Sequence, residues 1–377
     1  MTTRSARPRV AILGLGMIAE VHRRAALLAG ADVVGLLGRD HGRTRAAADA
    51  WGVPTAYRTI EEVAESDADV VHVCTPNATH APYSLALLAA GGKHVICEKP
   101  LGGDLAEAEA MAAAARAADV VTAVPFVYRY HPVVREIRAR RLAGELGATH
   151  AVHGSYLQDW LLSPDASSWR VDPAAGGASR AFADIGSHWF DLVEWVSGER
   201  MASLIAETRI ALPERPAGSV ASFSGPAGAD APRVTVTTED IAMVLARTAD
   251  GVPVSTTISQ VAAGRKNRLW FELDGAAGSA VFDQENPEYG WFGTATGAEV
   301  FVRDPGAGSA EQRRLATLPA GHAQGYAQCF EAFVADAYAV MGGEERDGLP
   351  TFEDGLRAAR LTDAVLRSAA GRAWTDI

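Results

Sequence analysis

Three polar side chains of this sequence have the types and the spacing needed for proton transfer at a hydroxyl group. Lys99 comes directly after the short apolar stretch 95–97 and Glu98, and Asp184 and His188 lie four positions apart later in the chain. A carboxylate beside an imidazole fixes the histidine tautomer and stabilises the imidazolium that forms on proton uptake. A lysine at the end of a buried strand carries a desolvation cost that a function or a partner must offset.

The residues around these groups restrict where they point. Pro100 lacks a backbone donor and fixes the chain direction, which aims Lys99 in a constant orientation. Glu98 either pairs with Lys99 or contacts the ribose of a cofactor. From Gly186 onward the apolar pattern predicts a helix that ends at Gly198, so positions 184 and 188 come within about 6 Å of each other on one face. Asp191 is interpreted as a surface or capping residue rather than a second catalytic acid.

A glycine-rich turn near the N-terminus predicts a dinucleotide site. Residues 10–13 form a short apolar strand, residues 14–19 read Gly-Leu-Gly-Met-Ile-Ala, a helix follows to about residue 29, and residues 32–37 form the next strand. Gly14 permits the tight turn, Gly16 lets backbone amides approach a pyrophosphate, and Ala19 lets helix and strand pack closely. The helix N-terminus then presents unpaired N–H groups and its positive dipole end to the anion.

The alternation of strands and helices continues after this unit. Helices are expected at 43–51, 78–90 and 104–118, and strands at 69–74, 94–97 and 120–124. Such alternation implies parallel pairing with right-handed crossovers, a doubly wound α/β sheet whose ligands bind beyond the carboxyl ends of the strands. The residues expected around the cofactor are Gly14, Gly16, Met17, Ile18, Arg39, Asp40, Thr75, Pro76, Asn77, His80, Glu98 and Lys99.

The tip of the second strand bears on the choice of nicotinamide cofactor. The acid that would hold the adenosine ribose is expected there, where the chain reads Leu37-Gly38-Arg39-Asp40. If Gly38 takes the place of the acid, there is room for a 2′-phosphate that Arg39 can meet. If the strand runs longer, Asp40 is the ribose acid instead. We expect NAD(P), with a slight preference for NADP(H) over NAD(H).

Beyond residue 127 the pattern changes to longer strands. Strands are expected at 149–157, 203–211, 241–247, 254–261, 269–273 and 300–303, and amphipathic helices at 326–340 and 352–370. Several strands alternate polar and apolar residues, as in an antiparallel sheet with one wet or interface face. Residues 217–232 are rich in Gly, Ala, Ser and Pro and are expected to form a loop. The predicted domains are therefore 1–127 and 128–377.

Bulk properties restrict the class of protein. The 377 residues fit two domains, and 48% hydrophobic content allows a substantial core. The net charge of −11 opposes binding to nucleic acids and anionic membranes. Cys74, Cys97 and Cys329 are interpreted as buried thiols in a reducing compartment. No stretch resembles a signal peptide or a membrane span, so we expect a cytoplasmic protein, and we expect no metal site.

These motifs together resemble a known family. The stretches that carry the resemblance are the glycine turn, Glu98-Lys99-Pro100, Tyr128-Arg129-Tyr130-His131-Pro132 and Asp184-x-Gly186-x-His188-x-x-Asp191. They are similar to the glucose-fructose oxidoreductase, inositol dehydrogenase and MocA family. The similarity covers nearly the whole chain, and the motifs are specific in combination. The chain departs from the family pattern at the second-strand tip, which leaves the cofactor choice open.

The resemblance carries expectations for fold and chemistry. It implies a Rossmann domain followed by an α/β domain with a large, mostly antiparallel sheet, and dimers or tetramers that pack through that sheet. It also implies NAD(P)-dependent oxidation or reduction at a secondary alcohol of a sugar or cyclitol. The lysine, aspartate and histidine of the family's catalytic set fall on Lys99, Asp184 and His188.

The second domain is expected to select the substrate. Hydroxyl groups of polyols are bound by charged and amide side chains, and their C–H surfaces by aromatic faces. The candidates for substrate binding are Tyr128, Arg129, Gln158, Asp159, Trp169, Arg170, His188 and His322. The run Arg265-Lys266-Asn267 either lines the pocket or a subunit face, or is a charged hairpin tip without a function, and the hairpin tip is favoured.

The sequence therefore predicts a dehydrogenase in which His188, oriented by Asp184, takes a hydroxyl proton and Lys99 stabilises the alkoxide. Two alternatives stay open. One is a regulator on the same fold that binds dinucleotide or sugar without catalysis, although such a protein would not need the set of Lys99, Asp184 and His188. The other is a glycoside-cleaving enzyme whose tightly bound cofactor oxidises and re-reduces one carbon.

Overall fold

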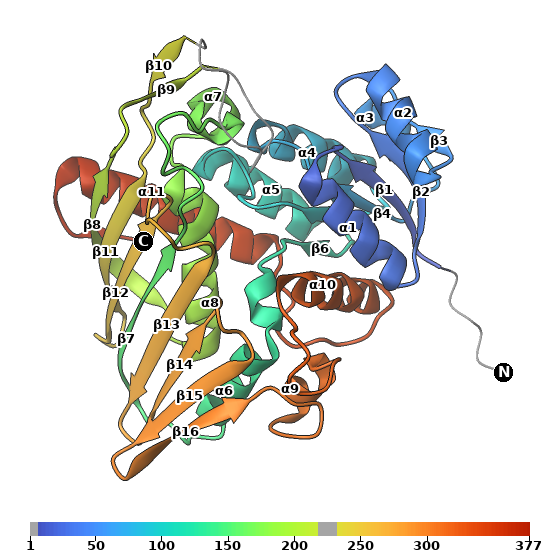
Figure 1. The fold of residues 1–377 in the computed structure, drawn as a ribbon. Helices are drawn as coiled ribbons and strands as arrows, with labels where there is room; N and C mark the ends of the chain where they lie inside the picture. The colour runs from blue at the N-terminus through green and yellow to red at the C-terminus, as the bar shows by residue number, and fades with distance from the viewer. Residues whose placement is uncertain (1–6, 218–231) are drawn as a thin grey trace. The chain divides into compact units, whose positions relative to one another are not determined.

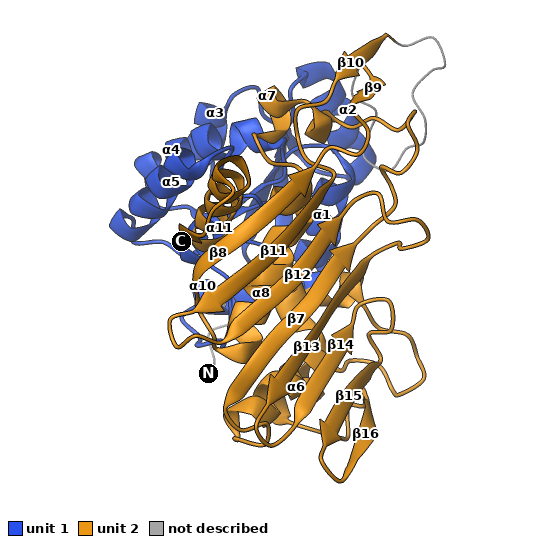
Figure 2. Cartoon of the chain, turned by 90° about the vertical axis from the view of Figure 1, so that its left-hand side faces the viewer, with its two compact units in different colours: residues 1–125, 330–356 blue, residues 126–329, 357–377 orange. Residues whose placement is uncertain are grey.

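The computed structural model describes residues 7–217 and 232–377. The chain divides into two compact units (Figure 2): unit 1 contains residues 1–125 and 330–356, and unit 2 contains residues 126–329 and 357–377. The sequence predicts domains 1–127 and 128–377. In the structure, residues 330–356 also belong to unit 1. The predicted loop at 217–232 lies almost wholly outside the described residues.

Unit 1 contains a six-stranded parallel sheet in the order β3-β2-β1-β4-β5-β6. Its strands are β1 (Arg9–Leu13), β2 (Asp32–Leu37), β3 (Thr55–Ala56), β4 (Val70–Val73), β5 (His94–Cys97) and β6 (Thr122–Ala123). All four residues of β4 are buried, as expected for an inner strand of a parallel sheet covered on both faces. The doubly wound fold predicted from the sequence is confirmed.

Five helices of unit 1 connect these strands: α1 (Met17–Leu28), α2 (His41–Trp51), α3 (Ile60–Glu65), α4 (His80–Ala90) and α5 (Leu105–Ala117). Asp104 is the N-cap of α5, because its carboxylate accepts a hydrogen bond from the Glu107 amide. Gly91 ends α4 with a positive φ of 76°. The short elements β3 and α3 were not predicted, since neither is long enough to establish a period.

Two C-terminal helices are divided between the units: α10 (Tyr326–Met341) and α11 (Phe352–Gly371). The part of α10 that begins at Phe330 packs into unit 1. The Phe330 ring lies edge-on to the His22 ring at 4.7 Å between centroids, and the Tyr338 hydroxyl lies 2.9 Å from His72 Nε2. The amphipathic pattern correctly predicts both helices, but it does not reveal which sheet their apolar faces cover.

Unit 2 is built on a nine-stranded sheet, seen from its open face in Figure 2, in the order β16-β15-β14-β13-β7-β12-β11-β8-β17. Every strand pair is antiparallel except β7 with β12. The strands are β7 (Thr149–Leu157), β8 (Met201–Arg209), β11 (Ile241–Thr248), β12 (Pro253–Ser259), β13 (Arg268–Gly275), β14 (Ser279–Asp283), β15 (Tyr289–Thr294), β16 (Gly297–Val302) and β17 (Thr375–Asp376). The predicted mostly antiparallel sheet is confirmed.

One face of this sheet carries the core of unit 2. Strand β11 alternates strictly, with Ala242, Val244 and Ala246 buried while Met243 and Leu245 are exposed. The buried face packs against α6 (Pro132–Leu142) and α8 (Ser187–Ser197), which lie behind the sheet in Figure 2. The opposite face is open.

Smaller elements complete unit 2: β9 (Glu214–Pro216) and β10 (Arg233–Thr235), which form a separate two-stranded sheet, and the helices η2 (Val127–Tyr130), η3 (Trp169–Val171), α7 (Pro173–Gly176), η4 (Phe182–Gly186) and α9 (Ala310–Leu315). Unit 1 has one further short helix, η1 (Asn77–Thr79). Figure 1 shows the path of the chain, coloured from blue at the N-terminus to red at the C-terminus. Among the helices described, none combines the length and the apolar character that a bilayer span requires.

Candidate active site

The glycine turn between β1 and α1 has the geometry of an anion cradle. Gly14 has a φ of 109°, and a Cβ there would lie 2.4 Å from the carbonyl oxygen of Cys74, so the turn itself requires glycine. Gly16 is the N-cap of α1, and a Cβ there would meet no protein atom within 4 Å. The space in front of Gly16 is therefore open at a helix N-terminus, which fits the pyrophosphate of a dinucleotide.

Substitutions at the two glycines should have separable effects. We expect Gly14→Ala to lower the free energy of unfolding by about 1–3 kcal/mol or more, because of the positive φ and the clash with Cys74. We expect Gly16→Ala to change that free energy by less than about 1 kcal/mol, yet to weaken dinucleotide binding by about tenfold or more, equivalent to ~1.4 kcal/mol. Chemical denaturation and cofactor titration measure the two effects. Equal loss of stability in both variants would contradict this assignment.

The tip of β2 bears on the two alternatives drawn from the sequence. A Cβ on Gly38 would lie 2.7 Å from Leu15 Cδ1 and 2.8 Å from Thr44 Oγ1, so a larger residue there would have to displace these side chains. The Asp40 side chain caps α2, because its Oδ1 accepts a hydrogen bond of 2.8 Å from the Arg43 amide. Arg39 is exposed at this tip. The hydrogen bond from Arg43 therefore already occupies one oxygen of the Asp40 carboxylate, the group that the second alternative assigns to the ribose.

The loop after β4 is tied to the loop after β5 by His80. The His80 ring is 1% exposed, with Nε2 at 2.8 Å from the Thr75 carbonyl oxygen and Nδ1 at 2.8 Å from the Pro100 carbonyl oxygen. Burial lowers the pKa of His80, against the raising effect of the two carbonyl contacts. His80 therefore holds two strand ends together, and its predicted contact with the cofactor remains a prediction. Asn77 in the same loop is buried.

Glu98 and Lys99 follow directly after β5. The Glu98 side chain is buried, and its Oε2 accepts a hydrogen bond of 3.2 Å from the Lys99 backbone amide. Its Oε1 lies 3.1 Å from His22 Nε2. Burial raises the pKa of Glu98, but His22, Lys99 and His80 outweigh it, so that the pKa is lowered and the group is an anion at neutral pH. Glu98 is thus bonded to the backbone of Lys99, one of the two alternatives left open.

In unit 2, His188 lies on the first turn of α8, directly after the π-helical turn η4. Its ring is 8% exposed and packs edge-on against Phe126 and Tyr128, at centroid distances of 5.5 and 5.1 Å. The Nδ1 atom is buried. The predicted helix end at Gly198 is confirmed, with a φ of 72°. The histidine is therefore held between aromatic rings rather than exposed on the helix surface.

Asp184 lies within η4, one turn before His188. One carboxylate oxygen accepts a hydrogen bond of 2.8 Å from Gln260 Nε2, and the other lies 3.3 Å from Arg170 Nε. Arg170 in turn stacks over the Trp169 ring at 4.5 Å. These contacts explain how the carboxylate is held, while its predicted action on His188 remains a proposal.

A hydrogen-bonded cluster of polar side chains lies beside His188 and includes residues that the sequence did not reveal. The Tyr128 and Tyr156 hydroxyls are 2.5 Å apart, and Tyr156 donates to Asn267 Oδ1 at 2.7 Å. Asn267 Nδ2 donates to the Tyr128 hydroxyl at 3.2 Å, and Gln158 Nε2 donates to Asn267 Oδ1 at 2.9 Å. Burial raises the pKa of Tyr128 to about 12, so the phenol stays protonated.

Tyr156 and Asn267 were missed for different reasons. Tyr156 belongs to the inward-facing set of β7, which the alternation of that strand could have identified. Asn267 belongs to the run interpreted as a charged hairpin tip. The run is not a hairpin tip, because the two strands that it connects, β12 and β13, lie on either side of β7 and do not pair with each other. Arg265 and Lys266 pair with Glu285 and Asp159 at 3.1 and 2.7 Å, and Asn267 joins the cluster.

The remaining predicted substrate residues are placed elsewhere. Arg129 is buried and donates from two nitrogens to the Asp191 carboxylate, which is itself only 9% exposed. The interpretation of Asp191 as a surface or capping residue is therefore wrong, because the ion pair with Arg129 offsets its burial. His322 lies on an exposed loop, where its carbonyl accepts a hydrogen bond from Arg303.

One group of potential metal ligands occurs among the described residues: His153, Glu272 and Asp274, on β7 and β13. Its side chains are partly exposed, and His153 and Tyr156 point to opposite faces of the sheet because they are three positions apart. The absence of a metal from the chemistry remains a prediction.

Comparisons with known proteins agree with this arrangement. Residues 8–126 match the oxidoreductase family with an NAD-binding Rossmann fold, and residues 134–281 match the GFO/IDH/MocA C-terminal domain. The chain is 31% identical to levoglucosan dehydrogenase of Pseudarthrobacter phenanthrenivorans, over 85% of this chain and 82% of that protein. It is 28% identical to inositol 2-dehydrogenase of Rhizobium meliloti, over 98% and 99% of the two chains.

A solved structure extends the similarity to three dimensions. Levoglucosan dehydrogenase in complex with NADH and L-sorbose superimposes with a TM-score of 0.88 at 28% identity, covering 98% of this chain and 99% of that one. Both sheets, the glycine turn and the two domain matches lead to one conclusion. The chain belongs to the GFO/IDH/MocA family of NAD-binding oxidoreductases.

Proposed function

We propose that this protein is an NAD(P)-dependent dehydrogenase that interconverts a secondary alcohol and a ketone on a sugar or cyclitol. The observation that carries the proposal is His188, a histidine held between aromatic rings beside a cluster of hydroxyl and amide groups. The named activities of the relatives support the substrate class. Lys99 in unit 1 supplies the cation that the chemistry requires.

The residues of unit 1 suit a nicotinamide dinucleotide. The N-terminus of α1, open at Gly16, would hold the pyrophosphate. The amides of Met17 and Ile18 would donate to it, and Thr75, Pro76 and Asn77 would border the nicotinamide half. When bound, the nicotinamide ring accepts a hydride from the alcohol carbon. Arg39 is the residue available for a 2′-phosphate, because Asp40 is engaged as the cap of α2.

This geometry favours NADP(H) slightly over NAD(H). We expect the dissociation constant of NADPH to be the lower of the two and to rise on Arg39→Ala, while that of NADH stays unchanged. Fluorescence titration with both reduced cofactors measures the difference. Tighter binding of NADH, unaffected by the substitution, would assign NAD(H) instead.

His188 is the group that moves the hydroxyl proton. Because its Nδ1 atom is buried, we assign proton uptake to Nε2. Asp184, held by Gln260 and Arg170, stabilises the imidazolium that results. The Lys99 ammonium stabilises negative charge on the substrate oxygen as the proton departs.

The cluster beside His188 orients the substrate. Tyr128, Tyr156, Asn267 and Gln158 offer donors and acceptors on one hydrogen-bonded platform, which suits several hydroxyl groups of one ring. Since burial raises the pKa of both phenols, they act here as neutral hydrogen-bonding groups rather than as bases. An anhydrosugar is the first substrate to test, because one relative is named for its action on levoglucosan.

A substrate screen tests the function itself. Inositols, aldoses, anhydrosugars and glycosides are each incubated with both cofactors, and nicotinamide absorbance at the reduced-cofactor band is followed. We expect reduction of the cofactor with at least one cyclic polyol. A protein that binds dinucleotide and sugar without turnover would instead be a regulator. A protein that purifies with reduced cofactor that does not dissociate, and cleaves glycosides, would be the redox-assisted lyase.

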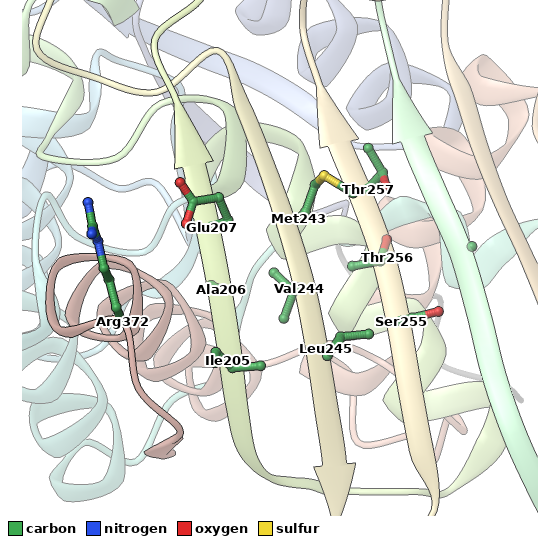
Figure 3. A pocket seen from close by; sticks show the side chains of 11 residues that line it. Ile205, Ala206, Glu207, Met243, Val244, Leu245, Ser255, Thr256, Thr257 and Arg372 are labelled. Atoms are coloured by element: carbon green, nitrogen blue, oxygen red, sulfur yellow. The ribbon is translucent and has the colours of Figure 1, made fainter.

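We further propose that the open face of the large sheet joins subunits into a dimer or tetramer. Strands β8, β11 and β12 form a groove of about 560 Å³ on this face, lined by Ile205, Met243 and Leu245 with Glu207 and Arg372 at its side (Figure 3). Met243 and Leu245 are 56% and 55% exposed. Apolar side chains concentrated on one face are typical of an interface.

The double substitution Met243→Glu with Leu245→Glu should weaken subunit association by at least about 30-fold, the equivalent of ~2 kcal/mol lost at a central interface position. The fold should survive, because both side chains are exposed within one chain. Light scattering over a concentration series measures the change. Leu142→Glu, at an equally exposed leucine on α6, is the control. An unchanged oligomer in the double variant would place the interface elsewhere.

A further inference from the structure

Four buried polar side chains form an unbroken hydrogen-bonded row inside unit 1. His22 Nε2 lies 3.1 Å from Glu98 Oε1, His22 Nδ1 lies 2.8 Å from His72 Nδ1, and His72 Nε2 lies 2.9 Å from the Tyr338 hydroxyl. Both histidines are 0% exposed, and Glu98 and Tyr338 are each 8% exposed. Three of the residues come from α1, β4 and α10, and Glu98 directly follows β5, so the row joins four separate parts of unit 1.

The contacts restrict where the protons lie. The two Nδ1 atoms face each other at 2.8 Å, so only one proton fits between them. If both imidazoles are neutral, Tyr338 donates to His72, His72 donates to His22, and His22 donates from Nε2 to Glu98. If His22 carries both protons, His72 instead donates to Tyr338. In either arrangement His22 donates a hydrogen bond from Nε2 to the Glu98 carboxylate.

Burial favours a neutral His72 and a protonated Tyr338. Burial and the neighbouring His22 lower the pKa of His72 well below its ordinary value, and burial raises the pKa of Tyr338 well above its own. A phenol that keeps its proton does not pass one onward. The row therefore holds groups in place and does not export protons to solvent.

Burying a row of polar side chains costs desolvation free energy, so stability alone does not explain why the protein has it. Burying polar groups in place of apolar ones of similar volume contributes little stability, and a well-packed apolar set is often at least as stable. The row ends next to Lys99, because the second oxygen of Glu98 accepts a hydrogen bond from the Lys99 backbone N–H. Helix α10 is thereby connected, bond by bond, to the backbone of the lysine.

We propose that His22, His72 and Tyr338 are positioning residues for Lys99. His22 holds the Glu98 carboxylate at one oxygen, so that the other oxygen keeps the Lys99 backbone in place, and His72 and Tyr338 fix the His22 ring from behind. This inference rests on the role of Lys99 in the proposed function. A displacement of about 1 Å at a reacting group can lower turnover by roughly 10²-fold, which sets the scale of the expected effect.

Three variants separate the links of the row. His22→Leu removes both hydrogen bonds of the ring, whereas His22→Gln keeps an amide donor for Glu98 and loses the contact with His72. Tyr338→Phe deletes one oxygen at the far end. We expect kcat to fall by up to roughly 10²-fold in His22→Leu, to recover largely in His22→Gln, and to fall less in Tyr338→Phe. KM and the dissociation constant of the cofactor should change little in all three.

Tyr57→Phe is the matched control, since Tyr57 is also a buried tyrosine of unit 1 and lies outside the row. Its turnover should equal that of the unmodified protein. Equal losses of turnover in Tyr57→Phe and Tyr338→Phe would show that the effect comes from a general loss of stability, and would overturn the inference. Tyr338→Phe removes a single atom, so it remains informative should His22→Leu fail to fold.

A second measurement reports on Lys99 without any turnover. The chain has three lysines, Lys93, Lys99 and Lys266, so labelling with ¹⁵N-lysine gives three backbone amide signals. In His22→Leu the Lys99 amide should shift and exchange faster with solvent, because its acceptor loses its anchor, while the Lys93 and Lys266 amides stay unchanged. His22→Gln should restore the original signal.

The two measurements distinguish the inference from the function on which it rests. If the unmodified protein turns over no polyol, the proposed function fails, whereas the Lys99 amide still reveals whether the row positions that residue. If turnover is present and neither kcat nor the Lys99 amide responds to His22→Leu, the inference fails and the dehydrogenase stands.

Discussion

Replacing His188 with alanine should lower kcat for polyol oxidation by about 10² to 10⁴-fold, the usual contribution of a positioned acid–base group. His188→Asn should lose turnover to the same extent, because an amide takes up no proton although it fills part of the space between Phe126 and Tyr128. Cofactor affinity should barely move, since the histidine belongs to unit 2 and the glycine turn to unit 1. Steady-state kinetics and a cofactor titration measure both quantities.

His150→Ala is the matched control for this substitution. His150 is an exposed histidine on β7 of the same unit, so its removal should change neither kcat nor thermal stability. Unchanged turnover in His188→Ala would show that the histidine takes no part in proton transfer and that it only packs between the aromatic rings.

Lys99→Ala should likewise lower kcat by about 10² to 10⁴-fold, because the charge that develops on the substrate oxygen loses its counter-charge in a site of low dielectric. Lys99→Arg keeps the charge and should retain more turnover than Lys99→Ala, although the planar guanidinium does not reproduce the geometry of an ammonium. Stopped-flow measurement of the first turnover would assign the loss to the chemical step rather than to product release.

Lys93→Met provides the contrast. The Lys93 ammonium donates to the Ser66 and Ala68 carbonyl oxygens at 2.7 and 3.0 Å, just before β5 begins, whereas Lys99 follows the end of that strand. Loss of Lys93 should therefore lower the free energy of unfolding and leave kcat of the folded protein unchanged. Full activity in both Lys99 variants would refute the proposed mechanism.

The fold of unit 1 is predictable because its signals are local. The bounds of β5 agree with the expected strand at 94–97, and Asp104 caps α5 as its sequence position indicates. The glycine turn likewise follows from a strand, a turn and a helix that are adjacent in the chain. In each case the deciding interactions join residues a few positions apart.

The parts that escaped prediction depend on contacts between distant positions. The apolar face of α10 is evident from its periodicity, but nothing local indicates that Phe330 packs on His22 of α1 and Tyr338 on His72 of β4, both more than 250 positions earlier. Asp191 was interpreted as exposed because its ion-pair partner, Arg129, is 62 positions away. Asn267 was interpreted within its charged run, whereas its partner hydroxyls come from η2 and β7.

Because residues 330–356 belong to unit 1, this unit cannot be completed until late in the synthesis of the chain. At about 5–20 residues per second, translation needs roughly 10–40 s to pass through residues 126–329 before the last piece of unit 1 is synthesised. During that interval His22 and His72 lack the aromatic side chains that will cover them. A fragment truncated after residue 127 would stay in that unfinished state, so a recombinant nucleotide-binding half must carry the later helix segment as well.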